Sequence, residues 1–150
     1  MQYNTIIIMT SNLGSDIILE GIKDGEITDE AREGVDILLR RSFRPEFLNR
    51  LDEIIYFNPL SREDIRKIVG LMLSELDSRL AARQVRVEVS DEARDYIIDR
   101  AYDPSFGARP LRRFISANVE SLVARKIIAE DIAPESVIRV DVKDGALVAE

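Results

Sequence analysis

The chain has 150 residues, of which 45% are hydrophobic and 33% are charged, and its formal net charge is −7. It contains no cysteine and no histidine, which excludes disulfides, thiolate or imidazole metal sites and Ser-His-Asp catalysis. The acidic charge argues against general nucleic-acid binding, and no apolar run approaches the roughly 20 residues of a membrane span.

The first predicted element is a strand. Residues 4–9 form a continuous apolar run, which is typical of a strand covered on both faces in a parallel sheet. Nothing before this run could pair with it, so we expect a segment of a larger domain. Residues 15–41 predict one or two helices around an acidic loop that contains glycine, at residues 23–26, and Thr28 is a suitable N-cap.

A short apolar segment follows these helices. Pro45 suits the first position of a short helix that ends near Arg50, and residues 54–57 predict a second buried strand. Asn58-Pro59 is the expected domain boundary. The first part, residues 1–58, would therefore be incomplete by itself.

Residues 59–150 contain clearer signals. Ser61 can cap a helix that runs to about Ala82 with an apolar stripe of 3.6-residue period. Val85, Val87 and Val89 alternate with charged residues, as in a half-buried strand.

Two further helices and a hairpin complete this second part. Ser90 can cap a helix to about Ala101, and Pro110 begins a long helix that reaches about Ala129. A strand at residues 138–142 then turns at Asp144-Gly145 into a final strand. The fold class is therefore α/β, with an incomplete first part followed by a complete αβααββ unit.

At three places, polar or charged side chains that could bind a ligand lie next to predicted rigid elements of the backbone. Asn12 follows the first predicted strand, where polar side chains of open α/β sheets contact ligands. Alternatively, Asn12 only begins a turn or caps the next helix.

The second place is the segment from Arg44 to Arg50. An arginine is always charged and can bind phosphate oxygens through two N–H groups, so Arg50 suits insertion into a neighbouring phosphoryl-transfer site. The alternative is an ordinary surface ion pair with Asp52 or Glu53, worth about 0–1 kcal/mol.

The third place has three arginines, Arg109, Arg112 and Arg113, at a predicted helix N-terminus. The helix dipole favours anions there and disfavours cations. The arginines therefore indicate an anionic ligand, unless acidic neighbours compensate them.

The chain resembles the second ATPase domain of Clp-type AAA+ unfoldases. Three stretches, taken in order, carry this resemblance: NTIIIMTSNLGS, FRPEFLNRLDEIIYF and YDPSFGARPLRR. The resemblance covers essentially the whole chain. It implies that residues 1–58 are the C-terminal remnant of an AAA+ large subdomain and that residues 59–150 are the complete small subdomain.

The resemblance also implies residue roles. Asn12 would be the sensor-1 residue that orients the attacking water, and Arg50 would be the arginine finger supplied to the adjacent subunit. Arg109 would be sensor 2, and Ile65 and Ile68 would lie near the adenine.

The family uses ATP and Mg²⁺, but its P-loop, magnesium-binding acids and pore loop are absent from this sequence. We therefore expect no hydrolysis and no tight cofactor binding by this chain alone, and no metal site. The implied partners are identical subunits of a hexameric ring, unfolded or aggregated polypeptide, and a co-chaperone, in the cytoplasm during stress.

Family members that feed a peptidase carry an [Ile/Leu/Val]-Gly-[Phe/Leu] loop before the finger. The glycines at positions 21, 25 and 34 do not match it, which favours the ClpB-like disaggregase branch. Two alternatives stay open: a peptidase-feeding unfoldase, and a free-standing interaction module without an ATPase role.

Overall fold

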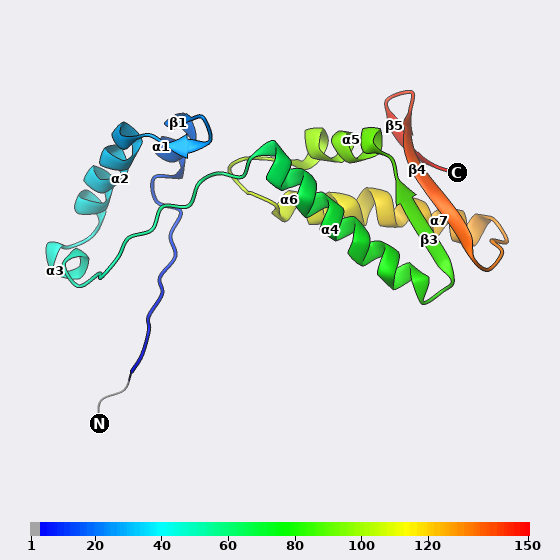
Figure 1. Ribbon diagram of the computed structural model, residues 1–150, viewed down its shortest axis with the longest axis horizontal. Helices are drawn as coiled ribbons and strands as arrows, with labels where there is room; N and C mark the ends of the chain where they lie inside the picture. The colour runs from blue at the N-terminus through cyan, green and yellow to red at the C-terminus, as the bar shows by residue number, and fades with distance from the viewer. Residues whose placement is uncertain (1–3) are drawn as a thin grey trace. The chain divides into compact units, whose positions relative to one another are not determined.

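A computed structural model of the chain describes residues 4–150 (Figure 1). The chain forms two compact units, Met1–Pro59 and Leu60–Glu150. Each unit has its own helices and its own small sheet.

The first unit consists of short helices and a two-stranded hairpin. Its elements are α1 (Ser15–Glu20), β1 (Ile22–Lys23), β2 (Glu26–Ile27), α2 (Asp29–Ser42) and α3 (Pro45–Leu48). The hairpin turn places Asp24 at φ 55° and Gly25 at φ 78°, the left-handed conformations that a tight hairpin needs. The predicted cap is confirmed, because the Thr28 hydroxyl accepts a hydrogen bond from the Ala31 N–H at 3.3 Å.

Close packing of α1 on α2 depends on one glycine. A Cβ atom on Gly21 would lie 2.3 Å from the Cβ of Ala31, so a larger residue would push the end of α1 away from α2. The buried side chains of this unit are Ile27, Ala31 and Val35. This core is small.

Both strands predicted for the first unit are wrong. Residues 4–9 and 54–57 have no regular secondary structure, and Ile7 and Ile55 are 88% and 66% exposed. The physical reason is that a buried strand needs hydrogen-bonded neighbours on its edges and layers on its faces. Among the described residues of this unit, the only strands are the two-residue β1 and β2, which pair with each other.

The second unit has the predicted αβααββ order. Its elements are α4 (Arg62–Ala81), β3 (Val85–Val89), α5 (Asp91–Ala101), α6 (Arg109–Phe114), η1 (Ile115–Glu120), α7 (Ser121–Ala129), β4 (Ser136–Lys143) and β5 (Ala146–Ala149). The α/β fold class is therefore confirmed. Ser61 and Asp64 form a reciprocal capping box on α4, with two hydrogen bonds of 3.1 Å.

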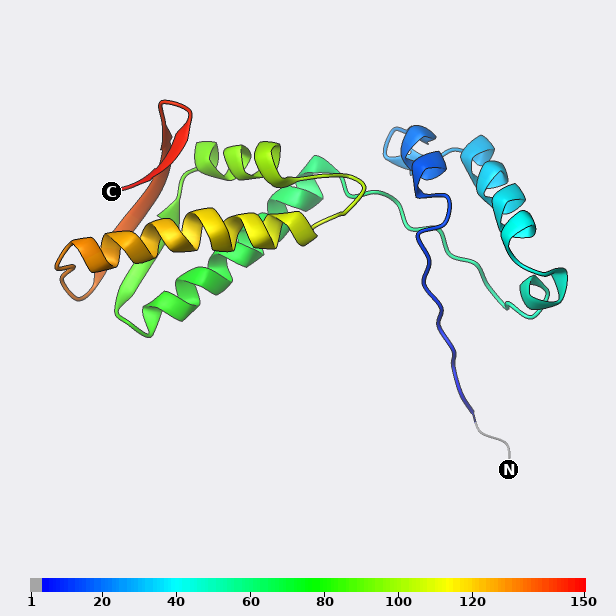
Figure 2. The same ribbon diagram turned by 180° about the vertical axis from the view of Figure 1, so that it is seen from behind.

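The long helix predicted from Pro110 is continuous, running from yellow-green to orange in Figure 2. Its middle segment, η1, between α6 and α7, is π-helical. The buried residues of the long helix recur every four positions, at Leu111, Ile115, Val119 and Val123. Four-residue steps overshoot an α-helical turn of 3.6 residues, so the row would drift away from the core. The wider π turn offsets this drift and keeps the row facing inward.

The sheet of the second unit has the strand order β3-β4-β5. β3 is parallel to β4, from Val85 opposite Ser136 to Val89 opposite Val140. β4 and β5 are antiparallel, and the predicted turn is confirmed, with Asp144 and Gly145 at φ 52° and 75°.

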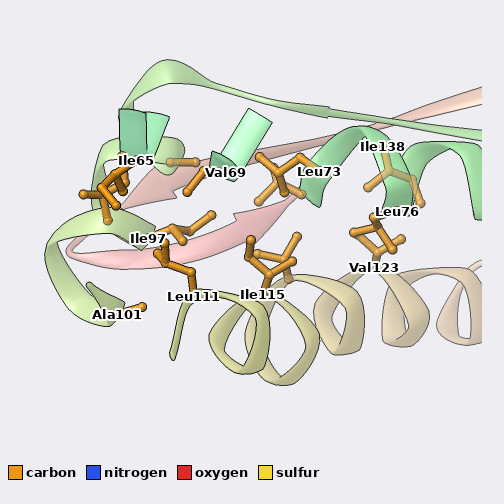
Figure 3. Packing of buried hydrophobic residues seen from close by; sticks show 14 of the residues in the cluster. Ile65, Val69, Leu73, Leu76, Ile97, Ala101, Leu111, Ile115, Val123 and Ile138 are labelled. Carbon is orange, nitrogen blue, oxygen red and sulfur yellow. The ribbon is translucent and has the colours of Figure 1, made fainter. Parts of the chain in front are cut away.

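The core of this unit lies between the helices and one face of the sheet (Figure 3). α4 contributes Ile65, Val69, Leu73 and Leu76 to this core, and Figure 3 shows them facing the row that begins at Leu111. The sheet contributes Val85, Ile138 and Val140.

The outer edge of β3 is closed by side chains instead of by another strand. The Val87 N–H donates to the Asp77 carboxylate at 2.8 Å, and the Arg94 Nε donates to the Val89 carbonyl at 3.2 Å. The single N–H on the Nε of Arg86 is shared between the two carboxylate oxygens of Asp77, each 3.0 Å away. The hydrogen bond from Arg86, followed by that from the Val87 N–H, lowers the pKa of Asp77. Unpaired strand edges promote association between chains, and Asp77 and Arg94 block this edge.

We expect residues 60–150 to fold alone and residues 1–59 to lack a cooperative transition. The large buried cluster lies entirely in the second unit, whereas the described part of the first unit fully buries only the side chains of Ile27, Ala31 and Val35. Circular dichroism melts of the two fragments check this. A sharp transition in residues 1–59 together with a broad one in residues 60–150 would contradict it.

Replacing Asp77 with alanine should lower the free energy of unfolding of the second unit by about 1–2 kcal/mol near neutral pH, because the Val87 N–H loses its acceptor. The pKa of Asp77 is lower in the folded state than in the unfolded state. Its contribution is therefore present above the unfolded pKa and is lost as pH falls through the folded pKa. Urea unfolding measures the free energy of unfolding of the wild-type and Asp77→Ala proteins. The difference between them should be smaller at the lowest pH at which both proteins fold than at pH 7.

Glu88→Ala provides the control for Asp77→Ala. Glu88 pairs with Arg139 at 3.5 Å on the solvent face of the sheet, where both side chains are exposed. This substitution should change the free energy of unfolding by no more than about 1 kcal/mol. Equal decreases in the free energy of unfolding in the two variants would show that the hydrogen bonds of Asp77 at the edge of β3 contribute no more than a surface ion pair.

Candidate functional site

The position of Asn12 is fixed by the start of α1. Its backbone carbonyl accepts hydrogen bonds from the Ser15 N–H at 3.2 Å and the Ser15 hydroxyl at 2.5 Å. The Ser11 hydroxyl accepts the Leu13 N–H at 3.1 Å. The turn is thus made by the backbone of Asn12 and by two serines. Within residues 4–150 the exposed Asn12 side chain forms no hydrogen bond, so its carboxamide is available to another molecule.

Arg50 follows a rigid turn built around α3. The Arg44 carbonyl opens this helix by accepting the Phe47 and Leu48 N–H groups at 3.0 and 3.2 Å. The Arg50 N–H donates to the Phe47 carbonyl at 3.1 Å, and the Phe43 and Phe47 rings lie 5.3 Å apart between centroids. Hydrogen bonds and ring contacts therefore fix the backbone at Arg50.

The guanidinium of Arg50 is exposed and has no carboxylate partner in the part of the chain that the structure describes. In particular, it pairs with neither Asp52 nor Glu53. The structure does not support the alternative in which Arg50 is an ordinary surface ion pair. Its N–H groups are free to bind an anion.

A compact loop precedes Arg109 in the second unit. The Asp103 carbonyl accepts the Phe106 and Gly107 N–H groups, both at 3.0 Å. Gly107 adopts φ 65°, a conformation that favours glycine. Arg109 is the first residue of α6 and is exposed, while Pro110 occupies the next position, as expected for a helix start.

The three arginines of α6 differ in their partners. Arg112 donates to Glu75 of α4 at 3.2 Å. Arg109 and Arg113 form no ion pair with any described residue. Compensation by an acidic neighbour, left open by the sequence, therefore applies to Arg112 alone.

Ile65 and Ile68 contribute to the apolar core. Ile65 is fully buried, and Ile68 is half-buried against the same cluster. A contact of either residue with adenine stays a prediction. Two surface hollows of the second unit lie on α4, one beside β3 and the other beside Arg112, and neither is lined by a predicted site residue.

Sequence reasoning missed one contact in the first unit. The Tyr56 hydroxyl donates a short hydrogen bond to Asp36 of α2, and the Arg32 guanidinium lies 5.6 Å from the centre of the Tyr56 ring. Burial first, and then the hydrogen bond to Asp36, raise the pKa of Tyr56 to about 12. The spacing of Arg32 and Asp36, one helical turn apart, was the available signal.

Residues 4–150 contain no cluster of three or more acidic, histidine or cysteine side chains placed to hold a metal ion. Among the same residues, no helix combines the length and apolarity that crossing a membrane requires. Asn12 and Arg50 belong to the first unit, and Arg109 belongs to the second.

Two family models match the chain. The model of the C-terminal, D2-small domain of ClpB protein matches residues 60–140, and the model of the AAA domain (Cdc48 subfamily) matches residues 2–54.

Individual relatives agree with these matches. The chain is 51% identical over 145 residues to chaperone protein ClpB of Nitratidesulfovibrio vulgaris, which covers 96% of this chain and 17% of that protein. A closed-state structure of Hsp104 with ATPγS and FITC casein aligns with a TM-score of 0.77 and 34% identity, over 97% of this chain and 25% of that one. The Hsp104–ADP complex of S. cerevisiae aligns with a TM-score of 0.78 and 33% identity, over 93% and 25%.

The chain thus spans 17% of the length of the bacterial ClpB that it matches. The resemblance expected from the three motifs is confirmed. The D2-small model alone covers more than half of the 150 residues. This chain therefore belongs to the family of the C-terminal, D2-small domain of ClpB protein.

Proposed function

We propose that this chain supplies nucleotide-sensing and trans-acting arginine elements to a hexameric, ATP-driven protein disaggregase. Residues 1–58 are the C-terminal part of an AAA+ large subdomain in this proposal, and residues 59–150 are the small subdomain. The observation that carries the proposal is the guanidinium of Arg50, which lies on a fixed turn without a carboxylate partner among residues 4–150, in a chain 51% identical to a ClpB.

Arg50 acts on the nucleotide of the adjacent subunit. Its forked N–H groups bind the oxygens of the transferred phosphoryl group, whose charge they stabilise in the transition state. A guanidinium already paired with Asp52 or Glu53 would first have to break that pair. The pairing pattern of the first unit therefore supports this role.

Asn12 and Arg109 have separate tasks. The exposed carboxamide of Asn12 can accept and donate hydrogen bonds, so it orients the attacking water. Arg109 binds the γ-phosphate and thereby couples the nucleotide to the small subdomain. Ile68, which is half-buried, forms the apolar wall nearest to the adenine, and the fully buried Ile65 lies in the core behind it.

ATP and Mg²⁺ are the cofactors of the proposed assembly. We expect the P-loop and the magnesium-binding acids outside this chain, which by itself should bind nucleotide weakly and hydrolyse none. Identical subunits form the ring, and a co-chaperone assists it. Two solved structures of the similar Hsp104 contain casein, which supports unfolded or aggregated polypeptide as the substrate, in the cytoplasm under stress.

Replacing Arg50 with alanine should reduce turnover strongly and leave nucleotide binding nearly unchanged. A suitable assembly is the ClpB of N. vulgaris with its 145 matched residues replaced by this chain. We expect a loss of up to about 10³-fold, the lower end of the range for arginine fingers. Steady-state ATPase assays and binding of a fluorescent nucleotide measure the two effects separately.

Arg44→Ala is the matched control for Arg50→Ala, because both arginines flank α3 and Arg44 contributes its backbone carbonyl. It should keep most of the turnover. Mixing Arg50→Ala subunits with subunits that lack a working P-loop should restore part of the activity. Full turnover of rings made only of the Arg50→Ala chimaera would refute the finger assignment.

Replacing Arg109 with alanine should weaken ATP binding in the same chimaera. Arg113→Ala is the best control, because Arg113 is exposed, lies one turn further along the helix and likewise forms no ion pair with the residues that the structure describes. Arg112→Ala should have little effect on nucleotide, since this arginine is engaged with Glu75. Titration with ATP compares the three variants, and a larger loss for Arg112 or Arg113 would move the sensor to that residue.

A further inference from the structure

Residues 52–58, which follow Arg50 and Leu51, have a single hydrogen-bonded attachment among the described residues. Residues 51–58 have no helix or strand, and Ile55 and Phe57 are exposed. Within residues 4–150, the only hydrogen bond formed by residues 52–58 is the one that the Tyr56 hydroxyl donates to Asp36.

This attachment is built on one face of α2. Arg32 and Asp36 lie one helical turn apart, and both contact Tyr56. Asp36 accepts the hydrogen bond from the hydroxyl, while the Arg32 guanidinium lies 5.6 Å from the ring centre, within range of a cation–π interaction. The ring and the hydroxyl of Tyr56 are therefore both held by α2.

The attachment closes a loop around Arg50. The chain runs from Asp36 along α2, turns at Phe43 into α3, passes Arg50 and returns to α2 at Tyr56. Arg50 is thus held on one side by its hydrogen bond to Phe47 and on the other by the anchored Tyr56. Without the Tyr56 hydroxyl, no hydrogen bond within the described residues would restrain the chain between residues 52 and 58.

The hydroxyl is a reliable donor. Burial and the neighbouring Asp36 raise the pKa of Tyr56 to about 12, while the nearby Arg32 opposes this rise. The hydroxyl therefore stays protonated at any physiological pH, and the attachment does not switch with pH in that range.

We propose that Tyr56 and Asp36 are positioning residues for Arg50, which hold the arginine in the direction needed for the neighbouring subunit. This inference rests on the proposed role of Arg50. A positioning residue that acts only through Arg50 changes the chemical step and leaves the binding of nucleotide to its own subunit unchanged.

The test uses Tyr56→Phe in the ClpB chimaera, a change that removes one oxygen atom. We expect kcat to fall about tenfold, which corresponds to about 1.4 kcal/mol, with KM and nucleotide affinity unchanged. Tyr96→Phe is the matched control. Its ring packs on Arg100 and Phe114, and its hydroxyl forms no hydrogen bond within the described residues, so kcat should stay at the wild-type value.

Substitutions of Asp36 provide a second test, in which the expected loss of kcat differs between variants. Asp36→Ala should match the loss seen in Tyr56→Phe, and Asp36→Asn should lose less, because its amide oxygen can still accept a hydrogen bond from the hydroxyl. The double variant Tyr56→Phe/Asp36→Ala should be no slower than either single variant. Likewise, Tyr56→Phe should add nothing to Arg50→Ala.

A readout that needs no activity is the mobility of this chain in solution. Order parameters from ¹⁵N relaxation should fall for residues 50–58 in Tyr56→Phe and stay unchanged in Tyr96→Phe. Unchanged mobility would overturn the proposal even if the chimaeras failed to assemble.

The outcomes also separate the two proposals. Full turnover of Arg50→Ala would refute the finger itself. A slow Arg50→Ala together with wild-type kcat in Tyr56→Phe would refute only the positioning role, as would a raised KM with unchanged kcat.

Discussion

The contact of α4 with the long helix of α6, η1 and α7 is the interaction on which the second unit depends. Each side chain buried there contributes about 1.5–3 kcal/mol relative to an exposed one, far more than a surface ion pair. Leu111 is fully buried and lies two residues from Arg109. The apolar contact therefore fixes where α6 begins, and with it the position of Arg109. The ion pair of Arg112 with Glu75 adds little stability but decides which arginine of α6 is neutralised.

Other ion pairs of the second unit resemble that of Arg112, because they add little stability but neutralise particular arginines. Arg62, Arg86 and Arg112 each contact a carboxylate across two elements of the second unit. Such pairs contribute little to the free energy of unfolding, but they occupy the N–H groups that would bind another anion. Arg50 and Arg109 are left without such partners in the described structure, and both occur in segments with fixed backbone geometry. A free guanidinium on a mobile loop would lose more conformational entropy on binding a phosphate than one held in place.

Local signals in the sequence predicted the second unit well, because its helices carry their own caps and stripes. The capping box at Ser61 and the turn at Asp144-Gly145 depend on residues within three positions of each other. The strands at residues 4–9 and 54–57 failed for the opposite reason, since a strand forms only when distant segments pair with it. The π segment η1 and the contact of Tyr56 with Asp36 also lay beyond local patterns. The free state of Arg50 could not be read from the sequence either, because Asp52 and Glu53 are close enough in the chain to pair with it.

In the proposed function, the first unit relies on contacts between residues that lie close together in the sequence. Its apolar side chains at residues 6–8, 54, 55 and 57 are exposed, yet the turn from Arg44 to Arg50 is formed in full. Every bond of that turn joins residues at most four positions apart, and the attachment through Tyr56 reaches back only 20 positions to Asp36. Burial of the apolar runs would add stability, because apolar surface would leave water. The direction of Arg50, by contrast, is decided by α2, α3 and the Tyr56 hydroxyl. The stability of the first unit and the direction of Arg50 are therefore determined by different residues, so a substitution can change one without changing the other.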